Sequence, residues 1–340
     1  MNVRSKFATA LAASALMFTA ACGNSSDSSS GGSAAGGSDS LAGKKVGFQF
    51  CAESNAWCAK YIDTIKERLG AEGIDVTVLT SNFDQVEDNQ HIDQLIAQKP
   101  DVLMIGPADP NGAVPAILRA HQAGIKIVNV VSKQEPAAQS VIDVNVLAGY
   151  TEMGDNAASL LVEGLKKAGH DSGNIIAITG PATNGVVVDT LAAFKDTLAK
   201  NPEYQLVAVE DGSWDAAKTQ TLTQQLLAQY ASKGGIDGIY AQADYMAPGA
   251  IQAVKQAGLK LGVKDQGIII TSANCSPSGP VAIKADELYG TGTEGPVDEA
   301  NAAADAVIKL LKGEDQEKVQ YTKQYTVTAD NIDEASRCEY

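Results

Sequence analysis

The sequence predicts an α/β protein built as two Rossmann-like lobes. Short runs of apolar, β-branched residues alternate with longer stretches of helical periodicity, which is typical of parallel sheets covered by helices on both faces. The pattern begins near residue 44 and restarts near residue 147. A chain of 340 residues is long enough for two such lobes, each with its own core.

The first half of the pattern opens with a strand expected at residues 45–50, Lys-Val-Gly-Phe-Gln-Phe. After it, apolar residues recur every four positions, as on the buried face of an amphipathic helix: Trp57, Tyr61, Ile65 and Leu69. The remaining apolar runs predict strands at 75–79, 102–105, 126–131 and 140–144, with helices at 85–98 and 111–123.

The second half opens with a helix expected at 147–168 and a strand at 174–179. The alternation then predicts helices ending near 200 and covering 216–231 and 248–257, and strands at 205–209, 238–240, 267–271 and near Gly290. Open parallel sheets bind ligands beyond the carboxyl ends of their strands. The turns that follow the strands are therefore the places to search for a site.

The composition excludes several classes of function. The formal net charge of -15 argues against nucleic-acid binding, which needs basic surface, and against adsorption to anionic lipid. With 44% hydrophobic and 20% charged residues, the chain has the composition of a globular protein. No apolar run after the N-terminal segment approaches the ~18 residues of a membrane-spanning helix, so a channel is not expected.

The N-terminus predicts export. Arg4 and Lys6 precede an uncharged apolar stretch at 7–19, which is the layout of a signal peptide over residues 1–21. The small residues before Cys22 resemble the lipobox of bacterial lipoproteins, although Thr19 stands where leucine is usual. We favour lipidation of Cys22 over simple cleavage near Ala21. The Gly- and Ser-rich residues 22–42 would then form a flexible tether to the outer face of the cell membrane, with the lipid as the only membrane contact.

Cysteine usage agrees with export. If Cys22 carries lipid, an even set remains: Cys51, Cys58, Cys275 and Cys338. Two disulfides are expected, with three possible connectivities, of which we favour 51–58 and 275–338; buried free thiols are the alternative. The chain has no C-x-x-C pair and only three scattered histidines, so no metal site is expected.

The turns after the predicted strands hold both tryptophans and several short polar side chains. An aromatic face stacks on C–H groups, while amides, hydroxyls and carboxylates bond to hydroxyl groups. The candidate ligand contacts are Glu53, Asn55, Trp57, Ser132, Trp214, Asp244, Asn274 and Glu294. Each also has a structural reading: Trp57 could be core, Asn55 a helix cap, and Trp214 a hydrophobic staple. Their shared position favours a site for a neutral polyhydroxy ligand.

Over roughly residues 44–328 the chain resembles the ribose-, galactose- and xylose-binding proteins, which are type I solute-binding proteins of sugar ABC importers. The matching stretches are 55–57, 107–109, 143–145 and, most specifically, 241–250, Ala-Gln-Ala-Asp-Tyr-Met-Ala-Pro-Gly-Ala. The resemblance implies two lobes joined by a three-crossover hinge that close around one ligand. The N-terminal lobe would comprise 43–146 plus 295–322, and the C-terminal lobe 147–294 plus 323–340.

The resemblance also implies site residues, and here the chain departs from aldose binders. It places Asn55, Trp57, Trp214, Asn274 and Glu294 among the contacts, and Thr190 is a further candidate ligand contact. Val131 and Ser132 stand where those proteins have an Asp-Arg pair, Thr190 where they have an arginine, and Ala243 where they have an asparagine. Because two guanidinium groups that would fork onto a pyranose are absent, a smaller ligand such as a linear sugar alcohol is expected.

The predicted function is that of an extracytoplasmic lipoprotein that acts as a monomer and delivers a small sugar or polyol to an ABC permease. The glycines at 290–295 match G-x-G-x-x-G but lie too late for a dinucleotide site, so no cofactor is expected. No G-x-S-x-G, P-loop or H-E-x-x-H motif is present, so an enzyme is not expected. A sensor lipoprotein that presents the ligand to a membrane receptor is the alternative, followed by a secreted α/β enzyme.

Overall fold

The computed structural model describes residues 40–293 and 295–338. The predicted signal peptide, the lipidation site Cys22, most of the tether and the candidate contact Glu294 lie outside these ranges. The tether was expected to reach residue 42, but Leu41 is only 4% exposed and belongs to the first hydrophobic core. The folded part therefore begins before residue 42, because an apolar side chain there has a core to enter.

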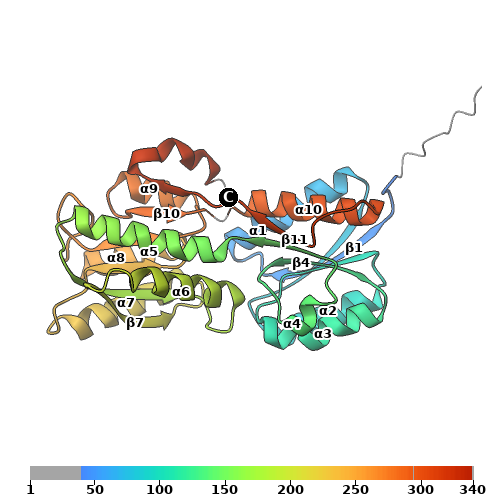
Figure 1. Ribbon diagram of the computed structural model, residues 1–340, viewed down its shortest axis with the longest axis horizontal. Coiled ribbons are helices and arrows are strands. Elements are labelled where there is room, and N and C mark those ends of the chain that lie inside the picture. The colour runs from blue at the N-terminus through green and yellow to red at the C-terminus, as the bar shows by residue number, and fades with distance from the viewer. Residues whose placement is uncertain (1–39, 294, 339–340) are drawn as a thin grey trace, which may run out of the picture. The chain divides into compact units, whose positions relative to one another are not determined.

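The first sheet has six strands, and all its pairings are parallel (Figure 1). Its order is β11 (Val319–Thr322), β5 (Val144–Ala148), β4 (Lys126–Val131), β3 (Val102–Ile105), β1 (Lys45–Cys51) and β2 (Asp75–Ser81). The helices that accompany it are α1 (Ala56–Ala71), α2 (Gln85–Ala97), α3 (Pro110–Gln122), α4 (Pro136–Gln139) and α10 (Pro296–Lys312).

The second sheet also has six strands, of which only β10 and β12 pair antiparallel. Its order is β12 (Thr326–Thr328), β10 (Gly290–Gly292), β9 (Ile269–Ser272), β8 (Gly238–Ala241), β6 (Gly173–Thr179) and β7 (Tyr204–Asp211). Its helices are α5 (Tyr150–Lys167), α6 (Gly185–Leu198), α7 (Ala216–Tyr230), α8 (Ala247–Gln256), α9 (Ser278–Lys284) and the 3₁₀ segment η1 (Ala329–Arg337).

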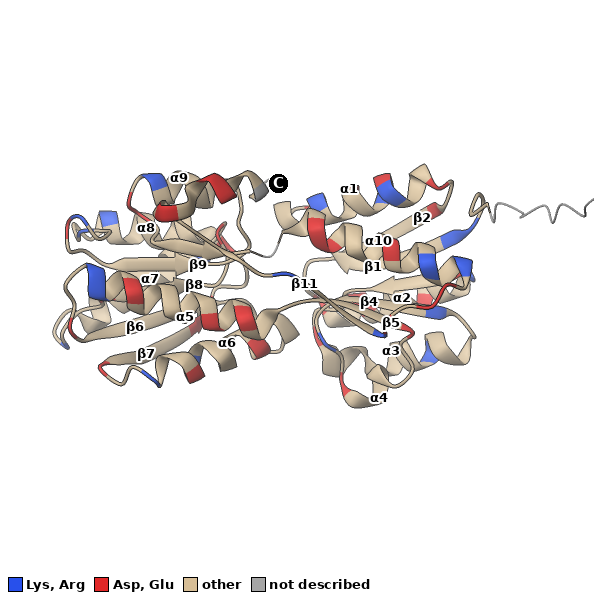
Figure 2. Cartoon of the chain, turned by 45° about the horizontal axis from the view of Figure 1, so that its top comes forward, with Lys and Arg blue, Asp and Glu red and all other residues tan. Residues whose placement is uncertain are grey.

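Alternation along the strands explains why both sheets are covered on two faces. In β6, Ile175 and Ala177 belong to the core that contains α5 and α6, while Ile176 and Ile178 belong to the core that contains α7 and α8. Successive strand residues point to opposite faces, so a strand that is apolar throughout must be covered twice. The segments coloured as charged residues in Figure 2 accordingly lie mostly on helices and turns.

The chain passes three times between the sheets: from β5 to α5, from β10 to α10, and from β11 to β12. This arrangement confirms the predicted fold class. The strand expected at 140–144 is wrong, however, because β5 begins at Val144 and continues to Ala148, past the expected lobe boundary at 146/147. Only residues 144–148 form an uninterrupted buried run, whereas Asp143 uses its carboxylate to accept a hydrogen bond from the Ile127 amide at 2.8 Å.

The described part of the chain contains two disulfides, and they have the favoured pairing. Cys51 at the end of β1 is bonded to Cys58 in the first turn of α1, with 5.8 Å between their Cα atoms. Cys275, in the loop after β9, is bonded to Cys338 after η1, with a Cα–Cα distance of 4.6 Å. Within 40–293 and 295–338, no helix is both long and apolar enough to cross a bilayer.

Candidate functional site

A cavity of about 60 Å³ lies where the carboxyl ends of strands from both sheets meet. Residues at or just beyond the ends of β1 to β4 form one side, and residues beyond β6 to β9 form the other. The lining residues are Phe50, Cys51, Asn55, Trp57, Cys58, Phe83, Gly106, Pro107, Ala108, Val131, Ser132, Asn184, Val186, Trp214, Tyr245 and Asn274. The position agrees with the rule for open parallel sheets.

Five of the sequence-predicted contacts line this cavity: Asn55, Trp57, Ser132, Trp214 and Asn274. Glu53, Thr190 and Asp244 do not line it. The Glu53 side chain is exposed and forms an ion pair with Lys66 at 3.3 Å. Thr190 is fully buried in α6, and its carbonyl oxygen packs so closely on Gly154 of α5 that a side chain at 154 would overlap it. Glu53 therefore forms an ion pair on the surface, and Thr190 contributes to the packing of α6 on α5.

Asp244 lies inside the second lobe rather than in the cavity wall. Its Oδ1 accepts hydrogen bonds from the hydroxyls of Ser272 and of Thr291, the latter at 2.7 Å, and its Oδ2 accepts one from the Ser276 amide at 2.9 Å. Burial raises the pKa of Asp244 to about 7, although these hydrogen bonds oppose the shift. The carboxyl group joins the ends of β8 and β9 to β10, next to the crossover into α10.

Two asparagines in the cavity wall are also helix caps. Oδ1 of Asn55 accepts from the amides of Trp57 at 3.0 Å and Cys58 at 3.3 Å, which begins α1. Oδ1 of Asn184 accepts from the Val186 amide at 3.0 Å, which begins α6. Because each cap fixes the oxygen toward its helix, the Nδ2 amide is the end of each side chain left to donate to a ligand. Asn55 can therefore cap α1 and contact a ligand at the same time.

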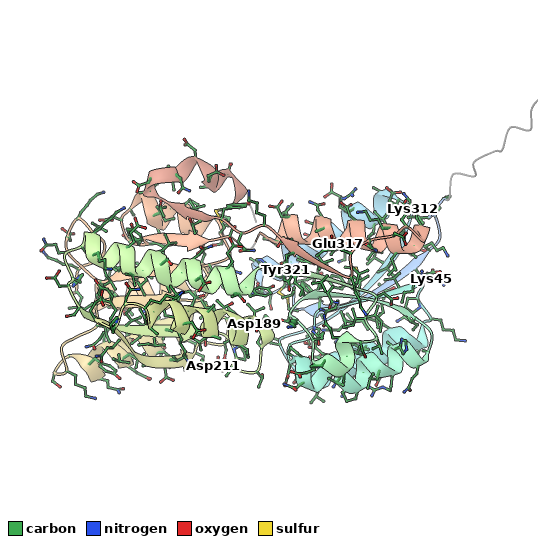
Figure 3. The ribbon with its side chains drawn as sticks, in the orientation of Figure 1. Lys45, Asp189, Asp211, Lys312, Glu317 and Tyr321 are labelled. Carbon is green, nitrogen blue, oxygen red and sulfur yellow. A yellow bond between two sulfur atoms is a disulfide. The ribbon has the colours of Figure 1, made fainter. Side chains whose placement is uncertain are left out.

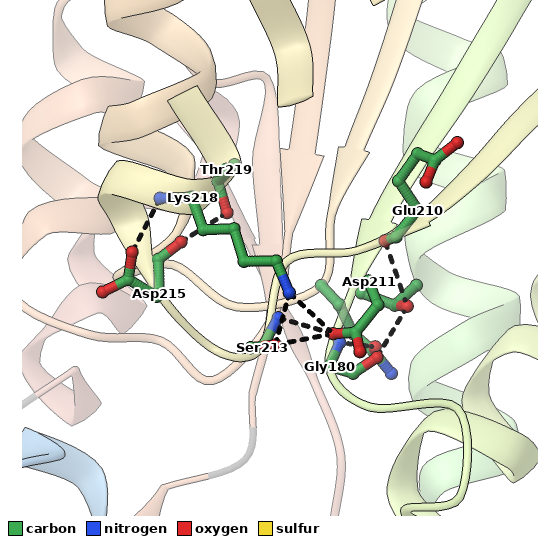
Figure 4. A network of polar contacts seen from close by, with 9 residues as sticks. Gly180, Glu210, Asp211, Ser213, Asp215, Lys218 and Thr219 are labelled. Atoms are coloured by element: carbon green, nitrogen blue, oxygen red, sulfur yellow. Dashed lines mark hydrogen bonds and ion pairs between the residues drawn. The ribbon is translucent and has the colours of Figure 1, made fainter. Parts of the chain in front are cut away.

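Trp214 reaches the cavity through a strained turn. Ser213 and Trp214 have φ angles of 51° and 56°, in the left-handed region that is uncommon for such residues. The turn is held by the Asp211 carboxylate, which accepts from the Ser213 amide at 2.7 Å, and by the Lys218 ammonium, which donates to the Ser213 hydroxyl at 2.7 Å (Figure 4). This network positions the indole, as expected where backbone strain accompanies function.

The indole of Trp214 has an unsatisfied donor. Its Nε1 is buried and has no hydrogen-bond partner among the described residues. A buried N–H without a partner costs about 1–3 kcal/mol, which a ligand oxygen at this point would recover. The ring centroids of Trp214 and Phe83 are 6.5 Å apart, and those of Trp57 and Phe50 are 6.1 Å apart. Aromatic walls therefore face the cavity from both sheets.

Strained backbone recurs around the cavity. Besides Trp214, the lining residues Phe83, Val131 and Asn274 have φ angles of 57°, 67° and 83°. Val131 is the clearest outlier because it is β-branched. Its turn is fixed by Asn129, whose Nδ2 donates to the carbonyl of Ser132 at 2.9 Å and to Oδ1 of Asn145 at 3.0 Å. Such over-determined strain is typical of a binding site.

A buried carboxylate supports the first-sheet side of the cavity. Asp88 is 1% exposed and accepts from Gln49 Nε2 at 2.7 Å, from the Ser81 hydroxyl at 2.5 Å and from the Ala108 amide at 2.9 Å. Burial raises the pKa of Asp88, and these hydrogen bonds oppose the rise. The residue joins the turn after β2, which leads to Phe83, to the turn after β3, which contains Ala108.

Sequence reasoning missed several lining residues, chiefly Phe83, Asn184 and Tyr245. The signal for Phe83 was available, since the rule that places ligands beyond strand ends applies equally to the strand predicted at 75–79. None of the described lining residues carries a charged side chain. The described residues also contain no cluster of histidine, cysteine and carboxylate groups suited to a metal ion. The cavity therefore suits a small neutral ligand with apolar faces and acceptor oxygens.

A second, larger hollow of about 690 Å³ includes Lys133 and Gly185, the sequence neighbours of two cavity residues. It is lined by charged groups as well, among them Glu135, Lys318 and Asp189, which Figure 3 labels on α6. Burial raises the pKa of Asp189, and the nearby Lys133 opposes this. Its size and charge distinguish it from the aromatic cavity, where the strained turns converge.

Comparison with known proteins agrees with this geometry. Residues 46–315 match the family described as periplasmic binding protein domain. A xylitol-binding protein of Mycolicibacterium smegmatis is 26% identical over 277 residues, which cover 78% of this chain and 74% of that protein. A fructose import binding protein of Bifidobacterium longum is 28% identical over 268 residues, 77% of each chain.

Solved structures show the same fold. A galactofuranose binding protein superposes with a TM-score of 0.79 at 24% identity, covering 86% of this chain and 97% of that one. An ABC transporter solute binding protein from Mycobacterium smegmatis with bound glycerol superposes with a TM-score of 0.76 at 25% identity, covering 86% and 96% of the two chains.

Proposed function

Because the chain belongs to the periplasmic binding protein family, we propose that it captures a small sugar or sugar alcohol outside the cytoplasm for an ABC importer. Membership of a family of binding proteins agrees with the prediction that the chain is not an enzyme. Relatives named for xylitol and fructose, and a solved relative that holds glycerol, support a polyhydroxy ligand.

The observation that carries the proposal is an uncharged, aromatic-walled cavity between the strand ends of two sheets. Trp57, Phe83 and Trp214 offer faces for the C–H groups of a carbon chain or ring. Asn55, Asn184 and the Trp214 indole offer donors to hydroxyl oxygens. A ligand bound there would be neutral and would need no counter-charge.

The size and lining of the cavity favour a short ligand over a pyranose. A volume of about 60 Å³ is small for a ligand pocket. Ser132 is in the wall and Thr190 is buried in helix packing, so neither position supplies the guanidinium fork that the aldose binders use. A linear polyol of three to five carbons is the preferred ligand class.

The proposed mechanism is conformational. A ligand that contacts Asn55 and Trp57 from one side and Asn184 and Trp214 from the other would stabilise the arrangement in which both sides touch it. The moving parts in this proposal are the lobes formed by 43–146 plus 295–322 and by 147–294 plus 323–340. The proposal also includes lipidation at Cys22 and a tether that keeps the lobes at the membrane. The protein would act as a monomer and deliver its ligand to a permease.

A thermal-shift series tests the ligand class. The chain from residue 40 onward, which retains Leu41, would be melted with glycerol, erythritol, xylitol, D-ribose, D-fructose and D-galactose in turn. A ligand that binds only the folded state raises the melting temperature by mass action, and the proposal expects the largest shift with a linear polyol. A shift with D-galactose alone would contradict the short-ligand class, and no shift with any of the six would refute the polyhydroxy assignment.

A further inference from the structure

The disulfide between Cys51 and Cys58 lies in the ligand cavity itself. Both half-cystines are among the lining residues, and both are almost fully buried. The disulfide joins the last residue of β1 to the first turn of α1, across a sequence separation of seven. The segment that it closes contains Asn55 and Trp57, which line the same cavity.

The contacts that fix this segment lie mostly at its α1 end, where Asn55 caps the helix and Trp57 is buried in the core of the first lobe. Glu53, Ser54 and Ala56 are exposed. The internal backbone hydrogen bond runs from the Asn55 amide to the Ala52 carbonyl at 3.0 Å. Trp57 packs on Phe50 and on Tyr61, at ring-centroid distances of 6.1 and 5.3 Å. The crosslink adds a covalent limit on how far the start of α1 can move from the end of β1.

The second disulfide has a different setting. Cys275 and Cys338 belong to a hydrophobic core of the second lobe, together with Ile270 and Val327, and neither lines the cavity. It joins residues 63 positions apart and so restrains a long stretch of the unfolded chain. Cys51 and Cys58 also belong to a hydrophobic core, that of the first lobe, so the two disulfides differ in that only the first lines the cavity.

We propose that the Cys51–Cys58 disulfide is a positioning element of the ligand site: it forms part of the cavity wall and holds Asn55 and Trp57 in the geometry that the ligand requires. This inference rests on the proposed function, since it assigns the cavity to a ligand. Its physical basis is preorganisation, because a segment already held in its bound conformation loses less entropy when the ligand arrives. The crosslink contributes to affinity through the segment that it holds.

Paired cysteine variants test the proposal. C51S/C58S and C275S/C338S are compared with the natural protein by thermal melting, by titration calorimetry with xylitol, and by hydrogen exchange of residues 52–60 without ligand. We expect C51S/C58S to weaken xylitol binding about tenfold or more and to speed exchange at 52–60. We expect C275S/C338S to lower the melting temperature while affinity stays within about twofold and exchange at 52–60 is unchanged.

Other outcomes overturn the inference or separate it from the proposed function. If C51S/C58S leaves exchange at 52–60 unchanged, or if both pairs weaken binding in proportion to their loss of melting temperature, the positioning role is refuted. If the natural protein does not bind xylitol, xylitol is not its ligand. The comparison of hydrogen exchange at 52–60 then still decides whether the disulfide positions the segment. C51A/C58A provides a second variant, which keeps the site apolar if the serine pair does not fold.

Discussion

The indole of Trp214 occupies the space that any side chain at position 180 would need. A Cβ atom added to Gly180 would overlap the six-membered ring of the indole and its Nε1. The Gly180 amide also donates to Oε1 of Gln242 at 3.1 Å, which fixes the turn after β6 against the turn after β8. Glycine is therefore required at position 180 because the indole ring approaches its backbone closely, and not because of its φ angle.

The first prediction follows from this contact. Gly180→Ala should displace the Trp214 ring and weaken binding of the polyol identified by thermal shift about tenfold or more, because the aromatic wall would no longer be in place. Calorimetric titration measures the effect. Gly70→Ala in α1 is the matched control, since a Cβ atom there meets nothing within 4 Å. Equal affinity of Gly180→Ala and the natural protein would show that Trp214 does not contact the ligand.

The second prediction concerns the unpaired indole N–H. Trp214→Phe keeps an aromatic face but removes the donor, so binding should weaken by about 0.5–1.5 kcal/mol, the net value of one hydrogen bond. Trp214→Ala should weaken it further, because the stacking surface is lost as well. Affinity and melting temperature are measured together. If both variants instead melt early while binding normally, Trp214 is a core residue.

The third prediction separates the two roles of Asn184. Asn184→Asp retains an oxygen that can cap α6 but replaces the Nδ2 donor with an acceptor, so affinity should fall while the melting temperature stays nearly constant. Asn184→Ala, which removes the cap too, should also lose about 1 kcal/mol of stability. Calorimetry and thermal melts distinguish the variants. Unchanged affinity in Asn184→Asp would mean that the side chain serves the helix alone.

The fourth prediction is a dependence of stability on pH. Folding raises the pKa of Asp244 from its ordinary 3.8 to about 7, so the folded state binds more protons than the unfolded state between these values. Its stabilising contribution is therefore complete below pH 4 and is lost as the pH rises through about 7. The buried carboxyl groups of Asp88 and Asp189 act in the same direction, since their pKa values are also raised.

Thermal melts of the natural protein and of Asp244→Asn between pH 4.5 and 8 measure this contribution. The variant cannot ionise at position 244, so its melting temperature should decline less over the interval than that of the natural protein. Asp63→Asn serves as the control, since Asp63 lies at an exposed position of α1. If the melting temperatures of all three proteins vary with pH in parallel, the pKa of Asp244 is the same in the folded and the unfolded chain.

Part of the candidate site could be predicted from the sequence. Asn55, Trp57, Ser132, Trp214 and Asn274 could be selected because they follow apolar strands, and parallel strands end at a common edge. The same rule selected Glu53 and Asp244, which the structure places elsewhere. Position relative to a strand tells which loop a residue occupies, but the direction of its side chain depends on the backbone of that loop. Trp214 and Asn274 have positive φ angles, which no local sequence pattern predicted.

The sequence by itself predicted the fold class, and among three possible connectivities it favoured the disulfide pairing that the structure shows. Both follow from local regularities: the period-2 and period-3.6 apolar patterns, and cysteines separated by seven residues or placed in the chain's last segment. The tertiary structure alone decided that Thr190 packs on α5, that Asp244 is enclosed by hydroxyl groups, and that Gly180 makes room for a ring 34 positions away. Those outcomes depend on contacts between residues distant in the chain, which periodicity cannot specify because it describes each element separately.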